Sequence, residues 1–265
     1  MPVRVERSSR VLTIIHSRPE ARNAVDPEHA EALYAAFLAF EEDDTADVAV
    51  FWGEGGAFCA GADLKRVATR DNKKLRQALD FPKHGGALPR GPMGPSRLEL
   101  SKPVIAAIEG PAVAGGMELA LWADCRVMAE DAYMGVYCRR WGVPLVDGGT
   151  VRLPRLIGQG RALEIIMTGR KVEAQECLRI GLCEKVVPKG QARRVAEEMA
   201  QEIARFPQAC VRADRRSVYL QQGLGVRAAL EQEWANSIGV VELEGVAGAA
   251  RFAKGAGRHG DFGKA

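Results

Sequence analysis

The sequence predicts an α/β protein, with a core of repeated strand–strand–helix units over residues 1–200 and a helical region over residues 201–265. Short apolar runs typical of buried strands alternate with helical segments through the first part. Beyond residue 191 only helical patterns remain. A length of 265 residues, 47% of them hydrophobic, allows one large domain, or a domain with a smaller appendage, around a sizeable core.

The N-terminal part of the chain carries the first such unit. Residues 3–6 and 11–16 are two strands joined by a turn. Asp26 and Pro27 start a helix, because aspartate is a favoured N-cap and proline suits the first helical position. Apolar side chains then recur with a 3.6-residue period, and the run at 48–52 is the next strand.

Further strands are predicted at 104–108, 125–129 and 184–187. Residues 81–96 contain too many prolines and glycines for a regular element, and we expect a mobile loop there. The C-terminal helices are expected at 195–206, 208–222 and 224–243, followed by a loose glycine-rich tail at 255–265.

Composition excludes several classes of protein. A formal net charge of +3 with 27% charged residues does not favour nucleic acid as a partner, but allows a local basic patch for a phosphorylated ligand. No apolar run approaches the ~20 residues of a membrane helix, and the N-terminus reads as a strand rather than a signal peptide. The six cysteines form no Cys-x-x-Cys pair, so we expect no metal site, reduced thiols and a cytoplasmic protein.

Two glycine-containing turns, residues 58–65 and 110–119, each follow a predicted strand. Small residues let backbone N–H groups approach a ligand oxygen closely. The N–H groups of Ala62 and Gly115 could therefore polarise one carbonyl oxygen, as an oxyanion hole requires, and Gly115 would add the dipole of the helix that it opens. The alternative is that Gly115-Gly116 is only a tight turn before a helix.

Glu118 is the candidate acid or base. It lies about one helical turn beyond Gly115, and an apolar pocket would raise the pKa of its carboxyl toward neutrality. It could instead be a capping carboxylate. No Gly-x-Ser-x-Gly sequence indicates a serine hydrolase, and residues 53–56 do not match a dinucleotide-binding turn.

The chain resembles the crotonase family, the enoyl-CoA hydratase/isomerase group. The residues that carry the resemblance are 18–24, 58–65, 105–119 and 147–158, continued by 163–169, 174–181 and 186–188. The resemblance implies a crotonase-type spiral of ββα repeats with a C-terminal α-helical region that builds trimers, often paired into hexamers. It also implies an acyl-CoA thioester substrate, with coenzyme A as part of the substrate and no separate cofactor.

The resemblance further implies a site. The thioester oxygen would lie between the N–H groups of Ala62 and Gly115. The backbone near Ala24, Ala60 and Leu64 would embrace the CoA moiety. Arg22 and Lys65 would contact its phosphates, unless both are simply solvated surface charges.

One departure from the family pattern affects the chemistry. Hydratases of this family use two glutamates, and Glu118 matches the first. Cys138 stands where the second is expected. Arg139 and Arg140 could lower the pKa of its thiol, or Cys138 could be a small residue that lines the pocket.

Asp147 is a possible substitute carboxylate, or a cap for the helix that begins near Gly148. Trp141 could wall the acyl pocket or pack in the core. Hydration of a 2-enoyl-CoA is the leading expectation. A single glutamate would favour isomerisation or decarboxylation on chemical grounds, and an acyl-CoA-binding protein without catalysis is the alternative from another class.

Overall fold

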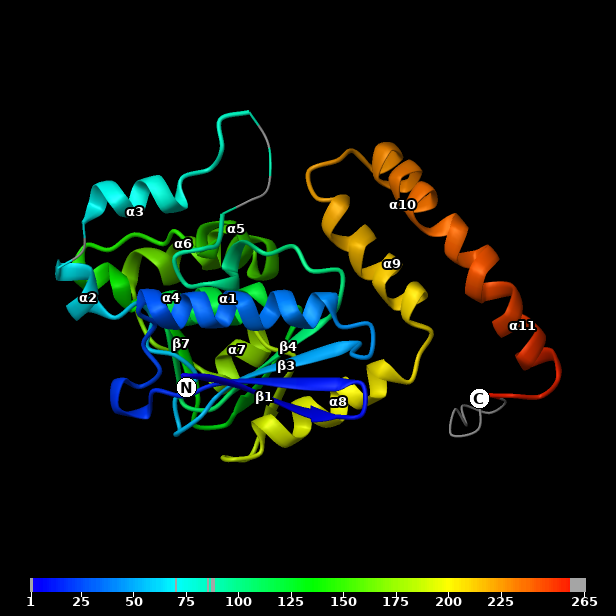
Figure 1. Cartoon of the computed structure of the whole chain (residues 1–265), viewed down its shortest axis with the longest axis horizontal. Helices are drawn as coiled ribbons and strands as arrows, with labels where there is room; N and C mark the ends of the chain where they lie inside the picture. Colours follow the sequence, from blue (N-terminus) through cyan, green and yellow to red (C-terminus); the bar gives the residue numbers. More distant parts are fainter. Residues whose placement is uncertain (1, 70, 85, 87–88, 258–265) are drawn as a thin grey trace. The chain divides into compact units, whose positions relative to one another are not determined.

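The computed structural model describes residues 2–69, 71–84, 86 and 89–257. The chain divides into two compact units, residues 1–201 and 202–265 (Figure 1). Among the described residues, no helix combines the length and the apolar character that crossing a bilayer requires.

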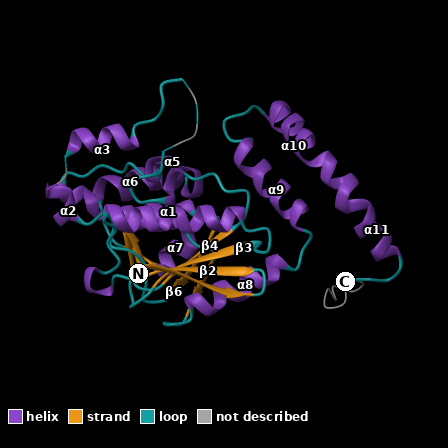
Figure 2. Cartoon of the chain, viewed as in Figure 1, coloured by secondary structure: helices purple, strands orange, loops and turns teal. Residues whose placement is uncertain are grey.

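Unit 1 contains two sheets. The larger has the strand order β1-β2-β3-β4-β6-β9, and all its neighbours are parallel except the hairpin of β1 and β2 (Figure 2). Its strands are β1 (Val3–Ser8), β2 (Val11–His16), β3 (Val48–Gly53), β4 (Val104–Ile108), β6 (Cys125–Ala129) and β9 (Lys185–Val187). The smaller sheet has the order β5-β7-β8 and consists of β5 (Pro111–Val113), β7 (Tyr133–Gly135) and β8 (Val172–Glu173).

Successive repeats add one strand to each sheet, which is the structural basis of the ββα spiral. β4 and β5 belong to one repeat and β6 and β7 to the next; β4 pairs with β6 in the large sheet, and β5 pairs with β7 in the small one. Helix α4 (Gly115–Trp122) follows β5 directly. The mixed α/β fold predicted from the sequence is confirmed.

The other helices of unit 1 include α5, which begins where a helix was expected near Gly148. These helices are α1 (Pro27–Glu42), α2 (Leu64–Thr69), α3 (Asn72–Leu79), α5 (Gly149–Ile157), α6 (Gln159–Thr168), α7 (Ala174–Ile180) and α8 (Ala192–Ala204), which runs across the boundary between the units. Three short 3-10 turns are η1 (Pro19–Ala21), η2 (Pro95–Arg97) and η3 (Tyr137–Trp141).

Helix α1 begins as predicted, because the Asp26 carboxylate accepts a hydrogen bond from His29 N at 2.8 Å. Phe37 belongs to its buried apolar stripe and contacts two other rings edge-on. The ring centroids lie 5.2 Å apart for Phe37 and Phe51 of β3, and 4.7 Å apart for Phe37 and Trp122 of α4. Such aromatic pairs add to the free energy of burial.

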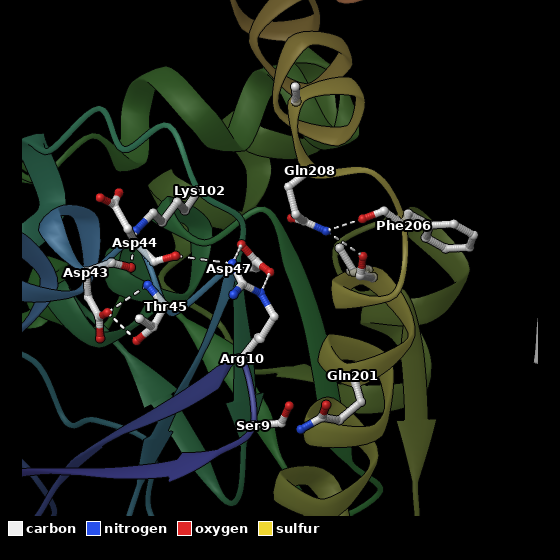
Figure 3. Close-up of polar contacts among 12 residues, drawn as sticks. Ser9, Arg10, Asp43, Asp44, Thr45, Asp47, Lys102, Gln201, Phe206 and Gln208 are labelled. Carbon is white, nitrogen blue, oxygen red and sulfur yellow. Dashed lines mark hydrogen bonds and ion pairs between the residues drawn. The ribbon is translucent and has the colours of Figure 1, made fainter. Parts of the chain in front are cut away.

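The C-terminal end of α1 is closed by a buried lysine. Lys102 is 2% exposed, and its Nζ donates to the carbonyl oxygens of Phe40 and Asp43, each at 2.8 Å (Figure 3). A cation at this end satisfies carbonyls that have no helical partner. The adjacent Arg10 pairs with Asp47, which joins the β1–β2 turn to the start of β3.

The expectation of a mobile loop at 81–96 is wrong for its second half. The backbone of Gly91 and Gly94 closes a turn through two mutual hydrogen bonds of 2.9 Å. Met93 and Ser96 are each 1% exposed. Of the first half, residues 85, 87 and 88 lie outside the described residues.

Unit 2 is helical and contains α9 (Gln208–Leu220), α10 (Val226–Val240), a π-helical turn (Val241–Gly245) and α11 (Val246–Ala253). Gln208 fixes the start of α9 by donating to the Phe206 carbonyl at 2.8 Å (Figure 3). Asn236 links α10 to α9 by donating to Ser217 Oγ at 2.8 Å. The π-helical turn joins α10 to α11, so the helix predicted at 224–243 continues to residue 253 and is longer than expected. Residues 258–265 of the predicted tail lie outside the described residues.

Candidate active site

The two glycine-containing turns lie side by side. Cys59 N donates to the Pro111 carbonyl and Val113 N donates to the Cys59 carbonyl, both at 3.0 Å. These bonds continue the pairing of the small sheet into the first turn. A Cβ placed on Gly61 would lie 2.9 Å from Ala114 Cβ and 3.1 Å from Gly115 N, at a φ of +94°, so glycine is what permits this approach.

The N–H groups of Ala62 and Gly115 lie at this junction. Val25 forms a parallel β-bridge with Ala62. The Val25 N–H donates to the Gly61 carbonyl at 2.8 Å, and the Val25 carbonyl accepts from Asp63 N at 2.9 Å. Within the described residues, neither the Ala62 nor the Gly115 N–H donates a hydrogen bond to the protein. Each N–H group is therefore free to donate to a ligand, and the Gly115 N–H belongs to the first turn of α4, where the helix dipole is positive.

The residue before Gly115 has strained backbone. Ala114 adopts φ 55° and ψ −126°, a region that non-glycine residues rarely populate. Strain of this kind persists only where surrounding contacts enforce it, and it is concentrated at functional sites. Ala114 is held by donating to the Gly135 carbonyl at 2.8 Å.

The predicted CoA-contacting residues come together through the pairing of 22–25 with 60–63. Ala60 N donates to the Arg22 carbonyl at 3.0 Å. Ala24 is buried, whereas Leu64 is 41% exposed and both Arg22 and Lys65 are exposed. In the described part of the chain, no carboxylate lies within ion-pair distance of Arg22 or Lys65, so both cations are available to an anionic ligand.

Arg18, which the sequence did not single out as a site residue, organises the same region. Its guanidinium donates to the Ala24 carbonyl at 2.7 Å and forms ion pairs with Asp26 at 3.0 Å and Asp63 at 3.2 Å. It therefore ties the segment 22–25 to the turn that carries Ala62. The only signal for it is its place in the 18–24 motif.

Glu118 is 3% exposed and lies on α4, three residues after Gly115. Its Oε1 accepts hydrogen bonds from the N–H groups of Asp147 and Gly149, both at 2.9 Å. Burial and the nearby Asp147 carboxylate raise the pKa of Glu118 to about 7, against the opposing effect of these N–H donors. Glu118 thus accepts hydrogen bonds from N–H groups at the start of α5, as a capping carboxylate does. Its pKa is also suited to proton transfer near pH 7.

Cys138 lies in η3 and is 8% exposed. Burial and the charge of Glu118 raise the pKa of its thiol, and Arg139 opposes this only in part. Arg140 stacks on the Tyr137 ring at 3.8 Å from its centroid. The alternative in which the two arginines lower the thiol pKa is therefore wrong, and Cys138 is a neutral small side chain near Glu118.

Asp147 is 3% exposed, and its Oδ1 accepts hydrogen bonds from Met93 N at 3.0 Å and from the Ser96 hydroxyl. Burial raises its pKa, while the Ser96 and Met93 donors act in the opposite direction. No side-chain hydrogen bond from Asp147 caps α5, whose N-cap is Gly148, so the capping alternative is wrong.

Trp141 is 70% exposed, so the expectation that it packs in the core of its own chain is also wrong. It ends a short turn of which only Cys138 is buried. Its role against the acyl group stays a prediction.

Met93 covers the second glycine-containing turn. A Cβ placed on Gly115 would lie 2.7 Å from the Met93 sulfur, so the thioether rests directly on that residue. Sequence reasoning missed Met93, because nothing local distinguishes it within a segment rich in proline and glycine.

Two surface hollows of about 550 and 470 Å3, one on α1 and one beside the start of α8, are lined by none of the candidate residues.

Comparison with known proteins decides the family. The model of the family described as enoyl-CoA hydratase/isomerase matches residues 6–237. The chain belongs to this family. Enoyl-CoA hydratase EchA19 of Mycobacterium tuberculosis is 35% identical over 221 residues, which cover 81% of this chain and 79% of that protein. Carnitinyl-CoA dehydratase of Salmonella typhi is 38% identical over 202 residues, 74% and 72% of the two chains.

Solved structures agree. The crystal structure of enoyl-CoA hydratase EchA1 from Mycobacterium marinum covers 96% of both chains with a TM-score of 0.85 and 30% identity. The crotonase fold inferred from the sequence is therefore confirmed for this member of the enoyl-CoA hydratase/isomerase family. Cys138, whose thiol pKa is raised, stands where the family resemblance led us to expect a second glutamate.

Proposed function

We propose that this enzyme is an enoyl-CoA hydratase that adds water to a 2-enoyl-CoA in fatty-acid or related acyl-CoA metabolism. The thioester oxygen accepts hydrogen bonds from the N–H groups of Ala62 and Gly115. Leu64 and the backbone at Ala24 and Ala60 line the CoA path. Arg22 and Lys65 contact its phosphates, and Cys138 and Trp141 border the acyl group.

In the proposed reaction, the Glu118 carboxylate takes a proton from water as the water oxygen bonds to the β-carbon. The electron pair of the carbon–carbon double bond moves onto the thioester, whose enolate oxygen the two N–H groups stabilise. Protonated Glu118 then returns the proton to the α-carbon. The observation that carries this proposal is a buried carboxyl with a pKa near 7, one helical turn from a free Gly115 N–H.

The test uses crotonyl-CoA, with loss of the conjugated thioester absorbance as the readout. We expect loss with the wild-type enzyme and a decrease in kcat of about 1,000-fold or more for Glu118→Gln, since the sole acid–base group is removed. Glu198→Gln, a change at an exposed glutamate, is the matched control. Full activity of Glu118→Gln would remove Glu118 from the mechanism.

The neutral thiol at Cys138 favours a second candidate, isomerisation of a 3-enoyl-CoA by Glu118 alone. A double-bond shift needs one group that moves one proton from the α- to the γ-carbon, and no second carboxyl. Conversion of a 3-enoyl-CoA without hydration of crotonyl-CoA would select it. Tight acyl-CoA binding without turnover of either substrate would indicate a binding protein instead.

We propose a homotrimer, or a hexamer of two trimers, acting in the cytoplasm. Helices α10 and α11 expose large apolar side chains, including Val226, Leu230, Trp234 and Val246 at 59–79%. Such surface supports association with further copies. Light scattering that gives the mass of a single chain would contradict the assembly.

The proposed cytoplasmic location is supported by the cysteines. All six are free thiols, as expected in a reducing compartment.

A further inference from the structure

Asp147 contacts both halves of the proposed catalytic apparatus. Its N–H donates to Glu118 Oε1 at 2.9 Å. Its carboxylate accepts from Met93 N at 3.0 Å and from the Ser96 hydroxyl. Met93 in turn rests on Gly115, whose N–H is one of the proposed oxyanion donors. A single residue therefore lies between the acid–base group and the glycine-containing turn.

We propose that Asp147 is a positioning residue that holds the segment 91–96 and the Glu118 carboxylate in one fixed arrangement, and that it is not a second acid or base. This inference rests on the proposed role of Glu118. The substrate contacts remain those of the two glycine-containing turns and of Glu118.

A second link joins the same elements through the main chain. The Arg152 guanidinium donates to the Asp147 carbonyl at 3.0 Å and to the Ser96 carbonyl at 2.8 Å. Asp147 and Ser96 are thus connected twice, by their own side chains and by Arg152. The 91–94 turn closes on itself, so fixing Ser96 and Met93 N also fixes the Met93 side chain over Gly115.

The hydrogen bonding of the Asp147 carboxylate argues against proton transfer. Its Oδ1 already accepts two hydrogen bonds, which occupy the lone pairs with which this oxygen would take up a proton. These donors lower the pKa of Asp147, although burial has the larger effect and raises it overall. The carboxylate is also buried, at 3% exposure of the residue. A charged acceptor with neutral donors makes stronger bonds than a neutral pair, which suits a group that holds a loop.

The test compares Asp147→Asn with Asp147→Ala, assayed at pH 8. The asparagine keeps an oxygen that accepts from Met93 N and Ser96, whereas alanine keeps none. We expect asparagine to retain kcat within about fivefold and alanine to lower it about 100-fold with little change in KM, because a misplacement of about 1 Å has an effect of that size. Equal loss in both variants, or full activity of Asp147→Ala, would overturn the proposal.

Ser96→Ala supplies a milder change, with Ser101→Ala on the exposed surface as its control. We expect a decrease in kcat of about tenfold for Ser96→Ala and none for the control. Should Asp147→Ala fail to fold, unchanged kcat in Ser96→Ala would still overturn the proposal.

Amide hydrogen exchange measures the same coupling without turnover. In Asp147→Ala we expect faster exchange at Met93, which loses its acceptor, and at Gly149, whose N–H binds Glu118. Asp147→Asn should protect both. Unchanged protection of Gly149 would contradict the positioning role even if the enzyme turns over no enoyl-CoA, whereas failure of turnover alone would contradict only the proposed function.

Discussion

The paired glycine-containing turns and the segment 91–96 both lie against the start of α4. Main-chain groups hold the turns in place, whereas side chains hold the segment. Main-chain hydrogen bonds from Cys59 and Val113 join the turns. Side chains hold the segment, namely the Asp147 carboxylate and the Arg152 guanidinium. The bonded partners lie far apart in the sequence in both regions, 51–56 residues for the side-chain bonds and 52–54 for the main-chain bonds, so the difference lies in the groups that bond.

This difference shows what each kind of placement demands of a sequence. Close approach of two backbones requires only small residues at the contact, and that requirement is visible locally in Gly61 and Gly115. A side-chain network requires particular groups at distant positions, which no local pattern reveals. The two regions should therefore respond differently to substitution.

The largest expected effect comes from Gly61→Ala. A methyl group there would lie 2.9 Å from Ala114 Cβ and 3.1 Å from Gly115 N, at a φ of +94° that alanine rarely adopts. Separation of the turns would remove one of the two proposed oxyanion donors, so we expect kcat/KM to fall by about 100- to 1,000-fold. The measurement is the crotonyl-CoA assay beside a thermal melt.

Gly160→Ala in α6 is the matched control for Gly61→Ala, because nothing lies within 4 Å of the added methyl. It should leave kcat/KM unchanged. A Gly61→Ala enzyme with wild-type kinetics would show that the close contact of the turns has no part in catalysis.

The contrast between the regions also explains which parts of the molecule the sequence predicted. The helix start at Asp26, the strand β4 and the position of Glu118 follow from periodicity, capping and spacing, all of which act within a few residues. The family resemblance supplied the order of the repeats, since strand pairing between repeats has no local signal.

The errors arose where burial depends on distant contacts. Proline and glycine correctly excluded regular structure at 91–94, but not burial, which Asp147 and Arg152 impose. The pKa of Cys138 follows from Glu118 and burial rather than from its neighbours in the sequence. Trp141 resembles a core residue by type alone and is exposed.

Met93→Ala tests the segment by packing. Met93 is 1% exposed, so its truncation leaves a cavity beside Gly115, and we expect the free energy of unfolding to fall by about 2–5 kcal/mol. The same space should let the enzyme accept acyl groups with larger substituents near the thioester. Denaturant titration and a panel of enoyl-CoA substrates measure the two effects.

Met167→Ala is the control for Met93→Ala, because Met167 is 65% exposed on α6. Its unfolding midpoint should stay close to that of the wild-type enzyme. Equal destabilisation by both variants would mean that Met93 contributes no packing specific to the turn.

The smallest effect expected is on pH dependence in Asp147→Asn. The charge of Asp147 raises the pKa of Glu118, although burial is the larger cause, and Arg97 and Arg152 are the cations near Asp147. Removing that negative charge should lower the Glu118 pKa from about 7. In the proposed reaction Glu118 acts first as a base, so activity appears as pH rises through its pKa. The acidic limb of kcat/KM should therefore move to lower pH. The variant should then lose less of its pH 8 activity at pH 6 than the wild-type enzyme does.

The control is Asp131→Asn, at a surface aspartate paired with Lys189, which should leave the acidic limb in place. A limb that stays in place in Asp147→Asn would show that the carboxylate acts on Glu118 through placement alone and not through its charge.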